Sequence, residues 1–259
     1  MTPTPEPPVD PKPAPPSVDL ALRTADSLVV PQPGELIPQK IRDYHVATTD
    51  EHHRYRSWEH CYGYFRTRTP QAIAADRDHA ALQLAFYLAS WGMYRGSSFL
   101  LQRAYTVHLG VIEKLTEPPF AVLWEQEFGA GPNDTELLPV VLKAADAVRK
   151  AYKPFAPTTG SRQPSDTLVT KVLLGTLGCL PACDRYFIAG FKSAGFSFSS
   201  LNAKSVARIL KFCHDNIATF RVEQARIENV GGMRYPLMKL VDMYFWQLGY
   251  ERANSEPHR

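Results

Sequence analysis

The feature that most constrains the fold is a series of segments with helical spacing, several of them opened by residues that favour a helix start. Thr69-Pro70 places a capping threonine before a proline at the first helical position, and Ser165-Asp166 opens an apolar segment with a capping serine. Within residues 136–152, apolar side chains recur every three or four positions. No stretch shows the alternation of apolar and polar residues that is typical of strands. We therefore predict an all-α fold with a single multi-helix domain.

The first 38 residues have a different composition. They contain half of the chain's 22 prolines. Because proline removes a backbone donor and fixes φ, so dense a run is unsuited to helix or sheet. We predict a disordered proline-rich tail over residues 1–38 and an all-α catalytic domain over residues 39–259.

Charge and hydropathy narrow the class of protein. The net charge of +3 is compatible with a nucleic-acid partner but does not indicate one. The longest apolar run, residues 80–93, is shorter than the roughly 20 residues that cross a bilayer. The chain opens without a signal peptide, so we expect a cytoplasmic protein with no membrane partner. The cysteines have irregular spacings that favour buried free thiols over a zinc site, and we expect neither metal nor cofactor: Cys61, Cys179, Cys183 and Cys213.

The common nucleotide and hydrolase signatures are absent from the sequence. It contains no phosphate-binding GxxxxGK[ST] loop, no GxGxxG after a strand, no HExxH and no GxSxG. P-loop NTPases, Rossmann dehydrogenases, zinc proteases and α/β-hydrolases therefore have no support.

The segment TKVLLGTLGCLPACDRYF, residues 170–187, holds the strongest candidates for chemistry. It begins as an apolar helix that carries Lys171, breaks at Gly178, and presents Asp184 at the start of another helix. An apolar helix face lowers the pKa of a lysine, which makes its amine a better nucleophile. A carboxylate stabilises positive charge that develops on a sugar, or activates water. The alternatives are a solvent-facing lysine and an aspartate that only caps its helix.

This arrangement resembles the helix-hairpin-helix superfamily of DNA glycosylases, and most of all its 8-oxoguanine-glycosylase-like branch. There, a Ser-Lys helix leads into a Pro-x-x-Asp turn, and the counterparts here are Thr170-Lys171 and residues 181–184. The Leu-Pro-Gly-x-Gly hairpin of the better-known members is not found.

The resemblance implies a DNA glycosylase that flips out a modified or damaged base of double-stranded DNA and excises it. Asp184 would act as the catalytic carboxylate and Lys171 as a catalytic amine. Similar helical glycosylases act in phage defence, and this resemblance implies a sugar-modified cytosine as the target. We expect a monomer and one-step hydrolysis, for which a carboxylate is sufficient.

A glycosylase also needs side chains that hold the extruded base and grip the DNA. Aromatic and polar residues of two stretches, together with the arginine after Asp184, are candidates for base binding: Trp58, His60, Tyr62, Trp91, Tyr94, Arg95 and Arg185. A partly buried aromatic cluster is the alternative. Lys204, Arg208 and Lys211 share one face of a predicted helix and are candidates for binding DNA phosphates, unless they form an ordinary solvated face.

Two rival functions remain at this stage. Residues 99–115 are predicted to form one helix, and within it Arg103 and His108 are spaced as Arg-x4-His, which resembles the motif of HEPN-type RNases of defence and toxin systems. In that case two subunits would bring these side chains to an RNA phosphate. The other alternative is a non-catalytic helical interaction module whose proline-rich tail binds a partner.

Overall fold

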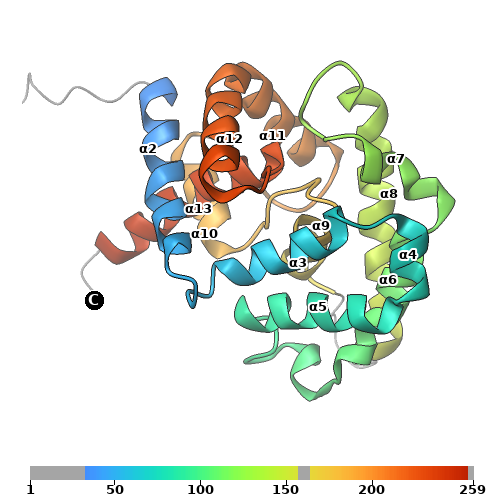
Figure 1. Cartoon of the computed structure of the whole chain (residues 1–259). Coiled ribbons are helices and arrows are strands. Elements are labelled where there is room, and N and C mark those ends of the chain that lie inside the picture. The colour runs from blue at the N-terminus through green and yellow to red at the C-terminus, as the bar shows by residue number, and fades with distance from the viewer. Residues whose placement is uncertain (1–32, 157–163, 256–259) are drawn as a thin grey trace, which may run out of the picture. The chain divides into compact units, whose positions relative to one another are not determined.

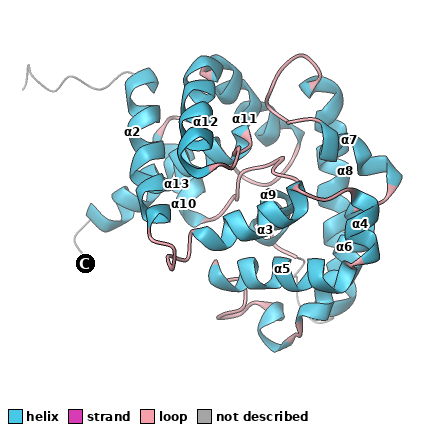
Figure 2. Ribbon diagram, viewed as in Figure 1, coloured by secondary structure: helices cyan, strands magenta, loops and turns pink. Residues whose placement is uncertain are grey.

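The computed structural model describes residues 33–156 and 164–255, and within them every regular element is a helix (Figures 1 and 2). The prediction of an all-α fold is confirmed. The α-helices are α2 (Pro33–His45), α3 (Arg56–Arg66), α4 (Pro70–Ala75), α5 (Arg77–Ser90), α6 (Leu109–Leu115), α7 (Ala121–Glu125), α8 (Asp134–Tyr152), α9 (Asp166–Thr176), α10 (Arg185–Ser193), α11 (Ala203–Asp215), α12 (Ile217–Gly231) and α13 (Leu237–Ser255). Short 3-10 helices are η1 (Val46–Thr49), η2 (Phe99–Gln102), η3 (Tyr105–His108), η4 (Pro118–Phe120) and η5 (Lys153–Phe155).

The boundary of the expected tail needs a correction. Residues 1–32 lie outside the described part of the chain, but α2 begins at Pro33. Residues 33–38, which were expected to belong to the tail, are therefore helical. Proline is tolerated in the first turn of a helix, and the buried side chains of Ile37, Ile41 and Tyr44 attach α2 to the core.

The capping residues act as the sequence predicts. The hydroxyl of Thr69 accepts a hydrogen bond from the backbone N–H of Ala72 at the start of α4. Ser165 accepts one from the N–H of Leu168 at the start of α9. Thr69 and Ser165 are therefore true N-caps, which satisfy backbone donors that have no partner within their helices.

The segment between residues 99 and 115 differs from the expected continuous helix. Only α6 at its end is α-helical, and η2 and η3 precede it. Arg103 and Ala104 have extended backbone angles that separate the two 3-10 helices. Tyr105 is drawn outward because its hydroxyl donates to Asp78, at 3.0 and 3.2 Å from the two carboxylate oxygens. Arg103 and His108 therefore do not share one helix.

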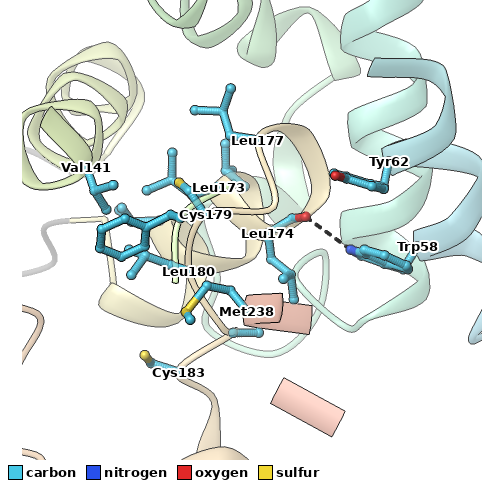
Figure 3. Packing of buried hydrophobic residues seen from close by; sticks show 14 of the residues in the cluster. Trp58, Tyr62, Val141, Leu173, Leu174, Leu177, Cys179, Leu180, Cys183 and Met238 are labelled. Atoms are coloured by element: carbon cyan, nitrogen blue, oxygen red, sulfur yellow. Dashed lines mark hydrogen bonds between the residues drawn. The ribbon is translucent and has the colours of Figure 1, made fainter. Parts of the chain in front are cut away.

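Helix α9 lies within the core of the described domain. Its residues from Leu168 to Thr176 are all buried, and α9 packs against α3, α5 and α8. Figure 3 shows Leu173 and Leu174 of α9 between Val141 of α8 and Trp58 of α3. The indole N–H of Trp58 donates to the carbonyl of Leu174 at 3.1 Å, the dashed line in that view.

Helices α10 and α13 approach each other more closely than side chains allow. A Cβ added to Gly190 would lie 1.9 Å from the carbonyl oxygen of Phe245, and one added to Gly249 would lie 1.9 Å from that of Tyr186. Only glycine permits this backbone contact. It fixes the position of α10, whose N-terminal cap is Asp184.

None of the described helices is long and apolar enough to cross a membrane.

Candidate functional site

The structure brings Lys171 and Asp184 together. The Nζ atom of Lys171 lies 3.4 Å from Oδ2 of Asp184, and it also donates to the carbonyl of Trp91 at 3.0 Å. Both side chains are nearly buried, with Lys171 only 4% exposed and Asp184 9%. The two residues that the sequence selected from either side of a helix break therefore form one contact pair.

Asp184 is both a helix cap and a partner of Lys171. Its Oδ1 accepts hydrogen bonds from the backbone N–H groups of Tyr186 and Phe187, at 3.0 and 3.1 Å. Its Oδ2 faces the lysine. The cap thus holds one carboxylate oxygen in place and leaves the other one directed at the Lys171 ammonium.

Two threonines of α9 attach the turn before Asp184 to the helix that carries Lys171. The hydroxyl of Thr170 accepts from the backbone N–H of Cys183 at 2.9 Å, and that of Thr167 donates to the carbonyl of the same residue at 2.9 Å. The threonine next to Lys171 therefore positions the turn that leads to the carboxylate.

Helix α13 holds the same turn from the other side. Asp242 accepts a hydrogen bond from the N–H of Ala182 at 2.9 Å, and its second oxygen lies 2.9 Å from Nζ of Lys239. Both side chains of this second Lys–Asp pair are buried. The Lys239 ammonium also donates to the hydroxyl of Tyr44 at 3.0 Å and faces the ring of Trp58 at 5.0 Å. No local pattern in the sequence singles out this pair.

The electrostatics of Lys171 follow from its burial. Burial lowers the pKa of Lys171 below its usual value, because the charged form loses hydration. The carboxylates of Asp184 and Asp242 oppose this change, and the Arg54 guanidinium reinforces it. The ammonium therefore loses its proton at a lower pH than an exposed lysine, while its contacts all favour the charged form.

A cavity of about 360 Å³ opens beside the pair. Its walls come from α9 and α13, from the C-terminal end of α5, from the N-terminal end of α10, and from the segments beside them. The lining residues are Arg54, Trp91, Gly92, Met93, Arg95, Thr167, Lys171, Asp184, Arg185, Tyr186 and Trp246. The catalytic candidates thus line a space that a small ring system can enter.

The cavity wall is aromatic and cationic. The ring of Trp91 stacks on Tyr55 with centroids 5.2 Å apart, and Arg54 lies over the Trp91 ring at 5.1 Å. Arg54, Arg95 and Arg185 have no carboxylate partner within residues 33–156 and 164–255. Asp184 is the one carboxylate among the lining residues. The cavity therefore favours an anionic or electron-rich ligand.

Two indole groups of this wall lack hydrogen-bond partners. The Nε1 atoms of Trp91 and Trp246 are buried and find no acceptor in the described chain. A buried donor without a partner costs about 1–3 kcal/mol. Both nitrogens are shielded from solvent, so a ligand reaches neither of them without a local movement.

The residues predicted to bind the base divide into two sets. Trp91, Arg95 and Arg185 line the cavity with Lys171 and Asp184. Trp58, His60, Tyr62 and Tyr94 do not line it. Arg54, Tyr186 and Trp246 do, although the sequence did not single them out. Tyr186 follows Arg185 and lies two residues after Asp184, and this closeness in sequence could have identified it as a cavity residue.

Four predicted base-binding residues have other roles. Trp58 is buried and stacks on Tyr62 at 5.0 Å within the core. Tyr62 lines a different cavity of about 270 Å³ with Arg66 and Glu127, and His60 is exposed on α3. These positions follow from the helical period of α3, which turns Trp58 and Tyr62 toward α9 and His60 toward solvent.

His108 and Tyr94 belong to a buried hydrogen-bonded group. The two ring nitrogens of His108 lie 2.7 Å from the hydroxyl of Tyr94 and 2.6 Å from that of Tyr152. Burial lowers the pKa of His108 to about 3. Arg103 is exposed and donates to the carbonyl of Phe155 at 3.1 Å. Both ring nitrogens of His108 are therefore engaged by tyrosine hydroxyls inside the protein.

The predicted phosphate-binding residues also separate. Lys204 and Arg208 line a third cavity, whereas Lys211 pairs with Asp215 at 2.8 Å along α11. The four cysteines are buried free thiols. Burial raises the pKa of Cys179 to about 12 and that of Cys61 further, so these thiols are unreactive.

Comparison with known proteins identifies no relative. No family model, no curated protein and no solved structure matches the chain.

Proposed function

We propose that the protein is a DNA glycosylase that extrudes a modified or damaged base from double-stranded DNA and hydrolyses its N-glycosidic bond. The observation that carries this proposal is the Lys171–Asp184 pair, with 3.4 Å between Nζ and Oδ2, in the wall of an aromatic and cationic cavity. The resemblance of residues 170–187 to the glycosylase turn adds to it. We also propose that the protein acts as a monomer.

Asp184 acts on the sugar. When the bond between C1′ and the base breaks, positive charge develops on the deoxyribose, and a fixed carboxylate stabilises it or activates water. Oδ1 is held by two backbone N–H groups, so the carboxylate does not rotate during the reaction. A group that is already oriented needs no reorganisation when the charge appears.

Lys171 acts on the departing base and on Asp184. Its ammonium contacts Oδ2 of Asp184 and the carbonyl of Trp91, so its charge stays next to the carboxylate. A cation in this position stabilises the negative charge that a leaving base takes up. We infer one-step hydrolysis, because the ion pair with Asp184 and the hydrogen bond to the carbonyl of Trp91 favour the protonated amine, which is not a nucleophile.

The cavity wall suits an extruded base. Trp91 and Tyr186 are aromatic rings on which a flipped base can stack, an interaction of about 1–3 kcal/mol per base. The three arginines without carboxylate partners are suited to the phosphates on either side of the extruded nucleotide. Both features follow from the lining residues alone.

The preference for a substituted base has its own support. A second hollow of about 370 Å³ shares Gly92, Met93 and Arg95 with the first cavity and adds the residues Ser97 and Ser98. A base with a polar substituent would place that group among these hydroxyls. A sugar-modified cytosine of phage DNA has this form, so we propose antiviral defence as the biological role.

The test is base release from a panel of duplexes, each with one damaged or modified base, including glucosylated 5-hydroxymethylcytosine. Alkaline cleavage of the product strand reports the abasic site. We expect release from at least one modified duplex and none from unmodified DNA. Asp184→Asn should reduce the rate by a hundredfold or more while DNA binding remains.

Asp215→Asn is the matched control, because Asp215 is an exposed carboxylate paired only with Lys211. It should keep the wild-type rate. Full activity of Asp184→Asn would limit Asp184 to its capping role, and no release from any duplex would reject the proposed reaction.

A further inference from the structure

A second cationic surface lies at the far end of α10. It is an open cavity of about 560 Å³, which we call the α10–α11 hollow, formed by Lys192 of α10, Lys204 and Arg208 of α11, and residues 195–199 between the two helices. All three charged residues are basic. The hollow therefore has the sign of charge that binds phosphate.

The charges of this hollow are not neutralised by the protein. Neither Lys192 nor Lys204 lies within ion-pair distance of a carboxylate in the described residues, and both are exposed. Arg208 is held in place because it donates to the carbonyl of Ser197 at 3.0 Å. Lys211, one turn further along α11, has instead its own partner in Asp215 at 2.8 Å. Free positive charge on α11 is thus confined to the end that faces the hollow.

Helix α10 joins the hollow to the candidate active site. Arg185 at its first position lines the active-site cavity, and Lys192 lines the hollow. Residues seven apart lie on the same side of an α-helix, and at 1.5 Å per residue they are about 10 Å apart along its axis. Phosphates of one DNA strand follow each other every 3.4 Å along the duplex, so about 10 Å corresponds to roughly three nucleotides.

We propose that the α10–α11 hollow binds the phosphodiester backbone of the DNA about three nucleotides from the excised base. Arg185 and Lys192, near the two ends of α10 and on one side of it, then hold one strand at two points, and the N-terminus of this helix carries Asp184. The inference rests on the proposed function in that it takes DNA as the ligand. It replaces Lys211 by Lys192 among the predicted phosphate contacts.

The experiment measures DNA affinity as a function of salt, in an Asp184→Asn background that binds without turnover. Each phosphate that a protein neutralises adds about 0.9 to the slope of log affinity against log salt. Lys192→Gln/Lys204→Gln should therefore reduce the slope by about 1.8. The matched control, Lys211→Gln, should leave the slope unchanged, because that lysine is already paired.

A second measurement locates the contact. Duplexes are shortened one base pair at a time, first on one side of the modified base and then on the other. For the parent protein, in which Lys192 and Lys204 are intact, DNA affinity should fall sharply when fewer than about three base pairs remain on one of the two sides of the modified base. The double variant should show no such step. Thermal melts of the double variant should match those of the parent, because both lysines are exposed.

Equal slopes for the double variant and its parent, or an equal loss in Lys211→Gln, would overturn the inference. Base release is measured separately with wild-type Asp184. A hollow-dependent slope without any base release would reject the glycosylase and retain the surface. Base release with equal slopes would reject the surface alone, and the absence of DNA binding would reject both.

Discussion

The carboxylate of Asp242 accepts a hydrogen bond of 2.9 Å from the backbone N–H of Ala182, two residues before Asp184. The same carboxylate pairs with Lys239 inside the core, so it has two separate tasks. One is to neutralise a buried ammonium, and the other is to hold the turn that leads to Asp184.

The two tasks of Asp242 can be separated by mutation. Asp242→Leu leaves Lys239 buried without its partner and should destabilise the fold by about 3–5 kcal/mol. Lys239→Met/Asp242→Leu removes both charges and should recover much of that loss, because an apolar pair often replaces a buried ion pair without cost. Base release should nevertheless stay low, because the N–H of Ala182 still lacks its acceptor. Urea unfolding and single-turnover rates check the two effects, and a double variant with full activity would show that the turn needs no anchor.

The role of the Lys171 charge predicts an alkaline limit to activity. Burial lowers the pKa of Lys171, so its ammonium deprotonates below the usual range for lysine. Activity that needs the ammonium should therefore fall as pH rises through this lowered pKa. Lys171→Arg keeps its charge throughout that range and should move the alkaline limb to higher pH, even if its overall rate is reduced. If the alkaline limb of the pH–rate profile lay at the same pH in both proteins, the titration of another group would cause it.

Borohydride trapping separates hydrolysis from attack by the amine. If Lys171 stays protonated beside Asp184, no Schiff base forms, and borohydride should give no covalent complex with substrate DNA. The measurement is a denaturing gel of reactions quenched with borohydride near neutral pH, with Lys171→Ala as the control. An abundant adduct that disappears in Lys171→Ala would show that the lysine is the nucleophile.

Two tryptophans should respond differently to truncation. Trp58→Ala removes a buried ring and its hydrogen bond to Leu174, and should cost about 3–5 kcal/mol of stability. Trp91→Ala keeps the backbone carbonyl that accepts from Lys171, and should weaken productive DNA binding about tenfold through the loss of base stacking. Thermal melts compared with single-turnover rates distinguish the two. If Trp91→Ala lost activity only in proportion to its loss of thermal stability, Trp91 would act as a core residue and not as a base-binding one.

The glycine contact between α10 and α13 should be sensitive to a single methyl group. Gly249→Ala would place a Cβ 1.9 Å from the carbonyl oxygen of Tyr186, so the helices must separate. We expect a loss of at least about 1–3 kcal/mol, as for other overpacked sites, together with reduced activity, because Tyr186 lines the cavity. Gly110→Ala in α6 is the control, since a Cβ there meets nothing within 4 Å. Equal melting temperatures for the two variants would contradict the close contact.

The sequence predicts the fold class and the central pair because both depend on local signals. Capping residues and helical spacing reveal most helices, and a break between Lys171 and Asp184 allows the two to meet. Residues 99–108 form two short 3-10 helices in place of the predicted continuous helix, and Tyr105 and His108 make contacts with distant side chains that a local pattern does not contain.

The composition of the cavity was harder to predict. The local sequences around Trp58 and Trp91 gave the same prediction for both tryptophans. Only the packing of α3 on α9 places Trp58 in the core, whereas Trp91 lies at the cavity. Trp246 and the Lys239–Asp242 pair come from the last described helix. Their part in the site depends on contacts across more than 50 residues, which a local pattern does not contain.

The anchoring of the turn by α13 also has a consequence for synthesis on the ribosome. Lys171 and Asp184 are translated well before Asp242, so a nascent chain holds both groups while Ala182 still lacks its acceptor. A chain that stops before residue 242 would contain the chemical groups of the site without the contact that aligns them. An enzyme that cuts bases from DNA would, by this order of assembly, gain its activity only after α13 has been translated.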